Sequence, residues 1–253
     1  MIDLHTHILP GLDDGASSWE DALEMAQTAA ETGTRILAAT AHSNIPGQDL
    51  SAWAGRYKRQ FETFRRLLEQ EKIPLQLASG MEIFAGEDLA GRLRRGELLT
   101  INKTRYPLVE FAMDTEAFLV YRTADRLLEE GYIPILAHPE RYRCVQRTPE
   151  HVYEWYRMGA VIQMNKGSIL GRFGERVKRT ADSLLRHRLV SLAASDAHSP
   201  LVRTTAMDEL TRLLERRYGS GCPWLLLEEN PARILRGEQV VWEEPIVPGG
   251  REI

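Results

Sequence analysis

Five of the seven histidines lie at or just after short apolar runs that have the length of β-strands. Alternate side chains of an extended segment point to the same side, so His5 and His7 can present both imidazoles to one site. Any one histidine alone is as easily a buried structural residue. Together they indicate a site for zinc, manganese or iron, which imidazole binds well. The five histidines are His5, His7, His42, His138 and His198.

Three carboxylates occupy equivalent positions. Glu82 and Glu110 follow or end apolar runs, and Asp196 stands beside His198. A single ion cannot use so many ligands, whereas two or three ions that share bridging carboxylates can, and such a cluster activates water and holds an oxyanion. We therefore predict a polynuclear metal site.

The loop Leu12-Asp13-Asp14-Gly15 lies close to His7 in the sequence. It could be only a turn ahead of a helix that starts at Ser18. Either Asp13 or Asp14 could also supply a further metal ligand, and the spacing does not choose between them.

Two arginines follow the same runs: Arg141 in His138-Pro139-Glu140-Arg141, and Arg203 beyond His198. Guanidinium groups bind phosphate through paired hydrogen bonds, which would give an acidic protein local positive charge for a phosphoester. Asn165, in Gln163-Met164-Asn165-Lys166-Gly167-Ser168, could orient the substrate or close a turn. From position alone, each arginine could equally have an exposed surface role, as most Lys and Arg side chains do. For Asn165 we predict the substrate-orienting role.

The elements that carry these residues alternate between strand-like and helix-like segments. Seven strands are expected, at 2–4, 35–40, 75–79, 107–110, 133–137, 160–164 and 190–194. Amphipathic helices are expected at 18–32, 53–71, 116–130, 149–158, 175–186 and 205–218. The aromatic and aliphatic residues of the 53–71 segment are read as core-facing, with no cofactor implied.

Such alternation predicts an α/β domain with a parallel sheet and crossover helices. In a parallel barrel, the carboxyl ends of the strands meet at one rim, which would gather the predicted ligands. No linker divides the 253 residues, so one domain is expected, with an irregular tail from about residue 237.

The composition excludes several classes of function. A formal charge of -4 and a pI near 6.0 indicate no general attraction to nucleic acid or anionic membranes. No apolar run reaches the roughly 18 residues of a membrane span, and a cytoplasmic location is expected. A cysteine phosphatase needs an arginine six positions after its nucleophile, but Glu150 and Glu228 follow Cys144 and Cys222 at that spacing.

At these residues the chain resembles the polymerase-and-histidinol-phosphatase (PHP) superfamily, and within it the bacterial tyrosine-protein phosphatases of capsule and exopolysaccharide operons. The resemblance runs almost end to end. It is carried by Met1-Ile2-Asp3-Leu4-His5-Thr6-His7, Leu12-Asp13-Asp14-Gly15, Ala39-Thr40-Ala41-His42, Gly80-Met81-Glu82, Leu108-Val109-Glu110-Phe111, Ala137-His138-Pro139-Glu140-Arg141-Tyr142, Gln163-Met164-Asn165-Lys166-Gly167-Ser168 and Ala194-Ser195-Asp196-Ala197-His198.

The resemblance implies a distorted (β/α)7 barrel with three divalent ions, usually manganese, although iron or zinc would accept the same ligands. It prefers Asp14 over Asp13 and places Arg141 and Arg203 at the phosphate. By analogy the ligands divide into three sets: His5, His7, Glu82 and Asp196; Glu82, Glu110 and His138; and Asp14, His42 and His198.

The implied activity is hydrolysis of phosphotyrosine, on a membrane-associated tyrosine kinase that controls polysaccharide export. Water activated by the metals would attack phosphorus in line while the arginines stabilise the developing charge, without a covalent phosphoenzyme. The oligomeric state stays open.

Three alternatives remain. A histidinol-phosphate phosphatase would use the same metals with a different pocket. A metal-dependent amidohydrolase has eight strands and commonly a bridging lysine on the fourth, where Glu110 stands here. A metal-stabilised binding module would have lost its activity.

Overall fold

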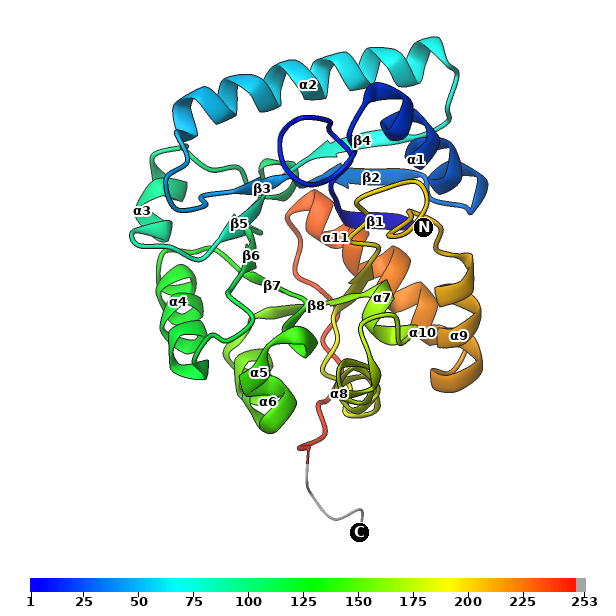
Figure 1. The fold of residues 1–253 in the computed structure, drawn as a ribbon. Coiled ribbons are helices and arrows are strands. Elements are labelled where there is room, and N and C mark those ends of the chain that lie inside the picture. The colour runs from blue at the N-terminus through cyan, green and yellow to red at the C-terminus, as the bar shows by residue number, and fades with distance from the viewer. Residues whose placement is uncertain (249–253) are drawn as a thin grey trace.

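Parallel strands run through the middle of the molecule and helices cover them on the outside (Figure 1). The structure is a computed structural model that describes residues 1–248, so the last five residues of the expected tail lie outside it. Every strand pairing is parallel. The strands are β1 Ile2–Thr6, β2 Ile36–Ala39, β3 His42–Ser43, β4 Gln76–Ser79, β5 Glu82–Phe84, β6 Leu108–Glu110, β7 Ile135–Ala137, β8 Val161–Asn165 and β9 Leu192–Ala194.

The strands form two sheets, in the orders β1-β2-β4 and β3-β5-β6-β7-β8-β9. The expected α/β class with parallel strands is confirmed, but the described residues form nine strands in two sheets rather than seven strands in one closed barrel. The difference arises at Thr40–Ala41 and Gly80–Met81, the two-residue segments that separate β2 from β3 and β4 from β5.

Backbone hydrogen bonds join the two sheets at both seams. The amide of Asp196 donates to the carbonyl oxygen of His5 at 2.9 Å, and the amide of His7 donates to Ala197 at 2.9 Å. At the other seam, the amide of Glu82 donates to the carbonyl oxygen of Thr40 at 3.1 Å. The ends of β1, β5 and β9 that carry predicted ligands are thereby fixed relative to one another.

The six expected helices are present with ends shifted by up to three residues. The helical segments are α1 Trp19–Glu31, α2 Leu50–Gln70, α3 Leu89–Arg94, η1 Ile101–Lys103, α4 Ala117–Glu129, η2 Pro139–Arg141, α5 Arg143–Arg147, α6 Glu150–Met158, α7 Lys166–Ile169, α8 Glu175–Arg186, α9 Asp208–Tyr218, α10 Gly221–Trp224, η3 Leu225–Glu229 and α11 Asn230–Arg236. The six expected helices do not include the helical structure that follows α9, from Gly221 to Arg236.

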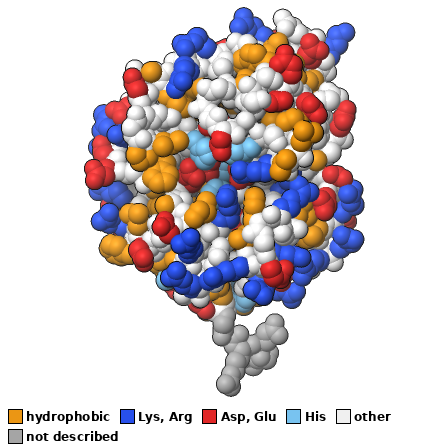
Figure 2. Space-filling view, viewed as in Figure 1, with side chains coloured by type: hydrophobic (Ala, Val, Ile, Leu, Met, Phe, Trp, Pro, Cys, Tyr) orange, Lys and Arg blue, Asp and Glu red, His pale blue; other side chains and the backbone are white. Residues whose placement is uncertain are grey.

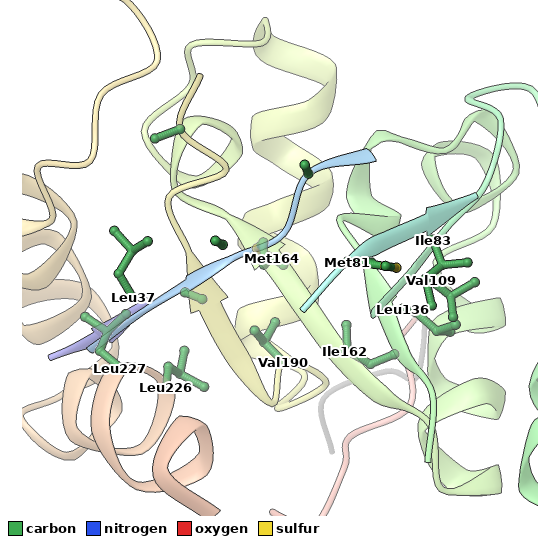
Figure 3. Close-up of a cluster of buried hydrophobic side chains, with 14 of the residues drawn as sticks. Leu37, Met81, Ile83, Val109, Leu136, Ile162, Met164, Val190, Leu226 and Leu227 are labelled. Atoms are coloured by element: carbon green, nitrogen blue, oxygen red, sulfur yellow. The ribbon is translucent and has the colours of Figure 1, made fainter. Parts of the chain in front are cut away.

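Both faces of the strands are buried, as is typical of parallel sheets covered by helices. Leu37, Val109 and Ile162 point into the larger hydrophobic cluster with Leu226 and Leu227 of η3 (Figure 3). Their chain neighbours Ala38, Leu108 and Val161 point to the opposite face and join a smaller hydrophobic cluster. Ile234 of α11 and Val240 of the tail belong to this smaller cluster and help to cover it. This alternation holds the strand ends rigidly.

Helix α2 shows how the outer layer positions a strand end. Its apolar residues recur at helical spacing and are buried, and the hydroxyl of one of them, Tyr57, donates to the carbonyl of Ala39 at 2.9 Å and accepts from the amide of Gly80 at 3.0 Å. These bonds lie at the ends of β2 and β4, just before the residues that carry His42 and Glu82.

Residues 237–248 contain no helix or strand but pack against the domain. The hydroxyl of Tyr156 bonds both backbone groups of Glu243, and the Asn230 amide bonds both backbone groups of Val241. Within residues 1–248, no helix has the length and apolar character required to cross a membrane.

Candidate metal centre

The predicted ligand side chains meet at one end of the strands. Figure 2 shows histidine and acidic side chains at the bottom of a hollow, with basic side chains beside it. Three groups have ligand atoms within 4.8 Å of one another. The groups are His5, His7, Glu82 and Asp196; His42, Glu82 and Glu110; and His7, Asp14, His42 and His198.

The first group has the same members as one ligand set implied by the resemblance. The Nε2 atoms of His5 and His7 face each other at 3.2 Å, and both lie within 3.2 Å of Glu82 Oε2. Glu82 Oε2 is buried and has no hydrogen-bond partner in the described structure. Facing imidazole nitrogens around an unpartnered carboxylate oxygen fit a divalent cation, which would satisfy all three atoms at once.

Glu82 is also the centre of the second group. Its Oε2 is 3.0 Å from His42 Nδ1, which is in turn 2.9 Å from Glu110 Oε1. The other oxygen, Oε1, is 2.9 Å from Nε2 of His138. His138 therefore lies at Glu82 as expected, with His42 as an additional neighbour, and the two Glu82 oxygens face different histidines, as a bridging carboxylate requires.

The two aspartates of the 12–15 loop have different surroundings. Asp14 has a side chain that is 70% exposed, and its Oδ1 lies 3.6 Å from His42 Nε2 and 3.5 Å from His198 Nε2. The side chain of Asp13 is only 3% exposed, and its Oδ2 lies 2.7 Å from His7 Nδ1 and accepts the amide of His42 at 2.8 Å. Asp14 can reach a metal, whereas Asp13 orients His7 by binding the ring nitrogen opposite to Nε2.

Gly15 lets this loop lie against β1. A Cβ atom at Gly15 would stand 2.1 Å from the carbonyl oxygen of His7, so no other residue fits without moving the backbone. The amide of Ala16 donates to the same oxygen at 2.9 Å. The loop that carries both aspartates is thus fixed directly to a predicted ligand.

Two predicted ligands have left-handed backbone conformations that non-glycine residues rarely adopt. The φ angle is 36° at His138 and 49° at Asp196. Strained conformations of this kind cost about 1–3 kcal/mol each and persist where the surrounding structure enforces them, often at functional sites. His138 directly follows β7, Asp196 lies two residues beyond β9, and each turn directs the side chain into the centre.

Charge coupling across the centre is strong. Burial lowers the pKa of His42, but its contacts with Glu110 and Glu82 outweigh this effect and raise the pKa to about 10. Burial opposes ionisation of Glu82 and Asp196, yet the surrounding histidines hold the pKa of both carboxyls below the usual range. His198, buried and beside His7, has its pKa lowered to about 4. The centre favours ionised carboxylates, ready to bind a cation.

Residues 1–236 match the family model described as "Capsular polysaccharide synthesis, CpsB/CapC". The chain belongs to the CpsB/CapC family. Tyrosine-protein phosphatase YwqE of Bacillus subtilis is 35% identical to it over 259 aligned positions, covering 98% of this chain and 96% of YwqE.

Solved structures agree with this CpsB/CapC assignment. One, described among structures of YwqE from Bacillus subtilis and CpsB from Streptococcus pneumoniae as unique metal-dependent tyrosine phosphatases, has a TM-score of 0.91 and 34% identity, covering 99% of this chain and 100% of that one. Dihydropyrimidinase from Brevibacillus agri has a TM-score of 0.57 and 10% identity, covering 96% and 73% of the two chains, which shows similarity of fold alone.

Both predicted phosphate-binding arginines of this CpsB/CapC chain lie beside Asp196. An Arg203 nitrogen donates to Asp196 Oδ2, and an Arg141 nitrogen lies 3.6 Å from the same oxygen. The other oxygen, Oδ1, lies 3.5 Å from His5 and 3.4 Å from His7. Asp196 therefore faces the predicted metal ligands with Oδ1 and the two arginines with Oδ2.

Asn165 contacts a predicted metal ligand. Its side chain is buried, its amide nitrogen donates to Asp196 Oδ2 at 2.5 Å, and its oxygen accepts from Gln163 at 2.9 Å. These bonds orient a predicted ligand, while contact between Asn165 and substrate stays a prediction.

Sequence reasoning assigned no role to several residues that support the ligands of the CpsB/CapC centre. Gln163 Oε1 is 3.1 Å from His5 Nδ1 and accepts the amide of His138 at 3.2 Å. Buried Glu140 accepts the amide of Asn165 at 3.1 Å, and burial raises its pKa. Gln163 and Glu140 lie inside motifs that carry the family resemblance, and this is the feature of the sequence that could have pointed to their supporting role.

Proposed function

We propose that this CpsB/CapC protein is a metal-dependent protein-tyrosine phosphatase that hydrolyses phosphotyrosine. The observation that carries the proposal is the cluster of three overlapping ligand groups with two arginines at its edge. The relatives support the same reaction, because they are tyrosine phosphatases and one is described as metal-dependent.

The predicted ligands would hold the metal in three sets. Glu82 would belong to two of them, with His5, His7 and Asp196 in the first and Glu110 and His138 in the second, and the third would consist of Asp14, His42 and His198. Bound divalent cations would supply Lewis acidity, lowering the pKa of water and neutralising phosphate charge. Asp13, Gln163 and Asn165 bind the far sides of ligands and hold them in orientation.

Arg141 and Arg203 would bind the phosphoryl oxygens and stabilise charge that develops on them during transfer to water. Both arginine side chains are partly exposed, at 24% for Arg141 and 30% for Arg203, so an incoming phosphate can reach them. A tyrosyl leaving group, whose pKa is about 10, departs without strong help from a general acid.

The capsular description of the family supports a substrate in polysaccharide synthesis, which we propose to be a phosphotyrosine protein such as a tyrosine kinase of polysaccharide export. We further propose manganese as the native metal, three ions per chain and a single phosphatase domain. The two sheets would act as parts of one distorted seven-stranded barrel, with β2 continuing into β3 and β4 into β5. A cytoplasmic location stays a prediction.

An amidohydrolase is disfavoured by the position of Lys166, which directly follows β8. The amino group of Lys166 donates to the backbone carbonyls of Thr204 and Ala206 and therefore does not bridge the ligand groups. Glu110, which ends β6, takes the position beside His42 instead.

The decisive experiment compares phosphate release from a phosphotyrosine peptide and from histidinol phosphate, with and without manganese, for the wild-type protein and His138→Ala. We expect preference for the peptide and dependence on both manganese and His138. Preference for histidinol phosphate would keep the metal centre and replace the proposed substrate, whereas turnover of neither compound would overturn the phosphatase proposal.

A further inference from the structure

Two guanidinium groups lie over a single aromatic ring. The Cζ atom of Arg141 is 4.8 Å from the centroid of the Phe173 ring, and that of Arg203 is 5.9 Å from it. Arg141 lies in η2 after β7, Arg203 lies beyond β9, and Phe173 lies between α7 and α8. Three separate segments therefore converge on this ring.

The Phe173 ring also packs against a glycine. A Cβ atom on Gly167 would lie 2.7 Å from Cε2 and 2.9 Å from Cζ of Phe173, so a larger residue at this position would displace the ring. The amide of Arg172 donates to the carbonyl of Gly167 at 2.8 Å, which folds the segment back over it. The motif that contains Asn165 thus also contains Gly167, against which the Phe173 ring packs.

This arrangement addresses an electrostatic difficulty. Both arginines are drawn to Asp196 Oδ2, and they repel each other because both are positively charged. An aromatic face attracts cations through its quadrupole. It binds a guanidinium without using its five N–H donors, which remain available for phosphate oxygens.

We propose that Phe173, seated on Gly167, is a positioning residue that holds Arg141 and Arg203 in place to bind the phosphoryl group. This inference rests on the proposed function and deepens it, since it concerns the same phosphate. Phe173 acts through the arginines and not through the metal ligands.

The test uses Phe173→Leu, which removes the aromatic face, and Phe173→Tyr, which retains it. Phe118→Leu is the matched control, because Arg122 lies 5.9 Å from the Phe118 ring and that side chain is 71% exposed. For each manganese-loaded protein, calorimetry gives the affinity for inorganic phosphate, metal analysis gives the manganese content, and an aryl phosphate gives kcat/KM.

We expect Phe173→Leu to weaken phosphate binding and to lower kcat/KM by roughly three- to thirtyfold, the range of a cation–π contact. Phe173→Tyr and Phe118→Leu should stay within about twofold of the wild type, and the manganese content should not change. Wild-type behaviour of Phe173→Leu, an equal loss in Phe173→Tyr, or a loss of manganese would overturn the inference. Wild-type protein that binds phosphate without turnover would refute the proposed function alone, because the binding measurements still test Phe173.

Discussion

Glu82 is the residue on which most of the centre depends. Its two oxygens face His138 on one side and His5, His7 and His42 on the other. It is buried, and its pKa is held low by the same histidines. Around it, ligands and supporting side chains have separable roles that single substitutions can distinguish.

Asp14→Asn should reduce manganese affinity by roughly tenfold or more, because it replaces an exposed carboxylate that faces His42 and His198. The free energy of unfolding of the metal-free protein should change by less than about 0.5 kcal/mol. Calorimetric titration with manganese and denaturant unfolding measure the two quantities. Asp125→Asn, an exposed substitution on α4, is the control, and equal affinity in both variants would rule out Asp14 as a ligand.

Asp13 should make metal-free stability depend on acidity. Burial alone would raise its pKa, but His7 and the amides of His42 and Gly15 lower it to about 2, from 3.8. Since the folded pKa lies below the unfolded one, the contribution of roughly 2 kcal/mol is present above about pH 4 and is lost as the pH falls towards 2.

Denaturant unfolding in chelator, with and without Asp13→Asn, measures this contribution. The difference between the two proteins should be constant near neutral pH and shrink below pH 4. A difference that does not change between pH 6 and pH 2 would contradict the role assigned to the carboxylate.

The residue types and their positions after apolar runs were enough to predict which side chains gather in the centre. They could not separate Asp13 from Asp14, because the difference lies in burial and in which His7 nitrogen is bonded. The contacts of Asn165 and Gln163 were equally inaccessible, since both depend on buried neighbours distant in sequence.

At the scale of elements, the outer helices fix where the strands end. Helix α2 does so through the Tyr57 hydroxyl, which bonds Ala39 and Gly80. Both bonds precede the two-residue interruptions after which β3 and β5 present His42 and Glu82.

Tyr57→Phe should lower the free energy of unfolding by about 1–3 kcal/mol, because it leaves the buried amide of Gly80 without its partner. Manganese affinity should fall as well, since the strand ends lose their tie to α2. Urea unfolding and metal titration measure these effects. Tyr153→Phe on α6 is the matched control. A Tyr57 variant that is no less stable than this control would show that the two bonds of the Tyr57 hydroxyl do not stabilise the strand ends.

Short apolar runs predicted the strands, and their alternation with helix-like segments predicted the parallel direction, because parallel strands need crossover connections. It could not predict the interruptions at Thr40–Ala41 and Gly80–Met81, where backbone hydrogen bonding changes without a change in composition. The helices from Gly221 to Arg236 were missed because residues such as Pro223 and Asn230-Pro231 are typical of helix ends.

At the scale of the whole molecule, the centre joins two sheets. His5 lies in β1 of the first sheet, and His7 directly follows that strand. Glu82 and Glu110 lie in strands of the second sheet, and His138 directly follows β7 of the same sheet. A bound metal would therefore connect parts of the chain that are otherwise held at the seams by a few backbone bonds.

Removal of metal should lower the midpoint of thermal unfolding. At a manganese concentration about a thousand times the Kd, the bound state would be about 4 kcal/mol more stable. Thermal unfolding in manganese and in EDTA measures the shift, which His138→Ala should reduce and Asp125→Asn should not. Identical midpoints with and without EDTA would mean that metal does not link the sheets.

The backbone bonds between His5 and Asp196, and between His7 and Ala197, also determine when the centre can form during biosynthesis. The strand made first has its partner about 190 residues later, so no ribosome-bound chain can complete the centre before that partner has been translated. At about 5–20 residues per second, this interval lasts about 10–40 seconds. During that time His5 and His7 lack Asp196 as a neighbour, and completion of the metal centre must follow synthesis of the ninth strand.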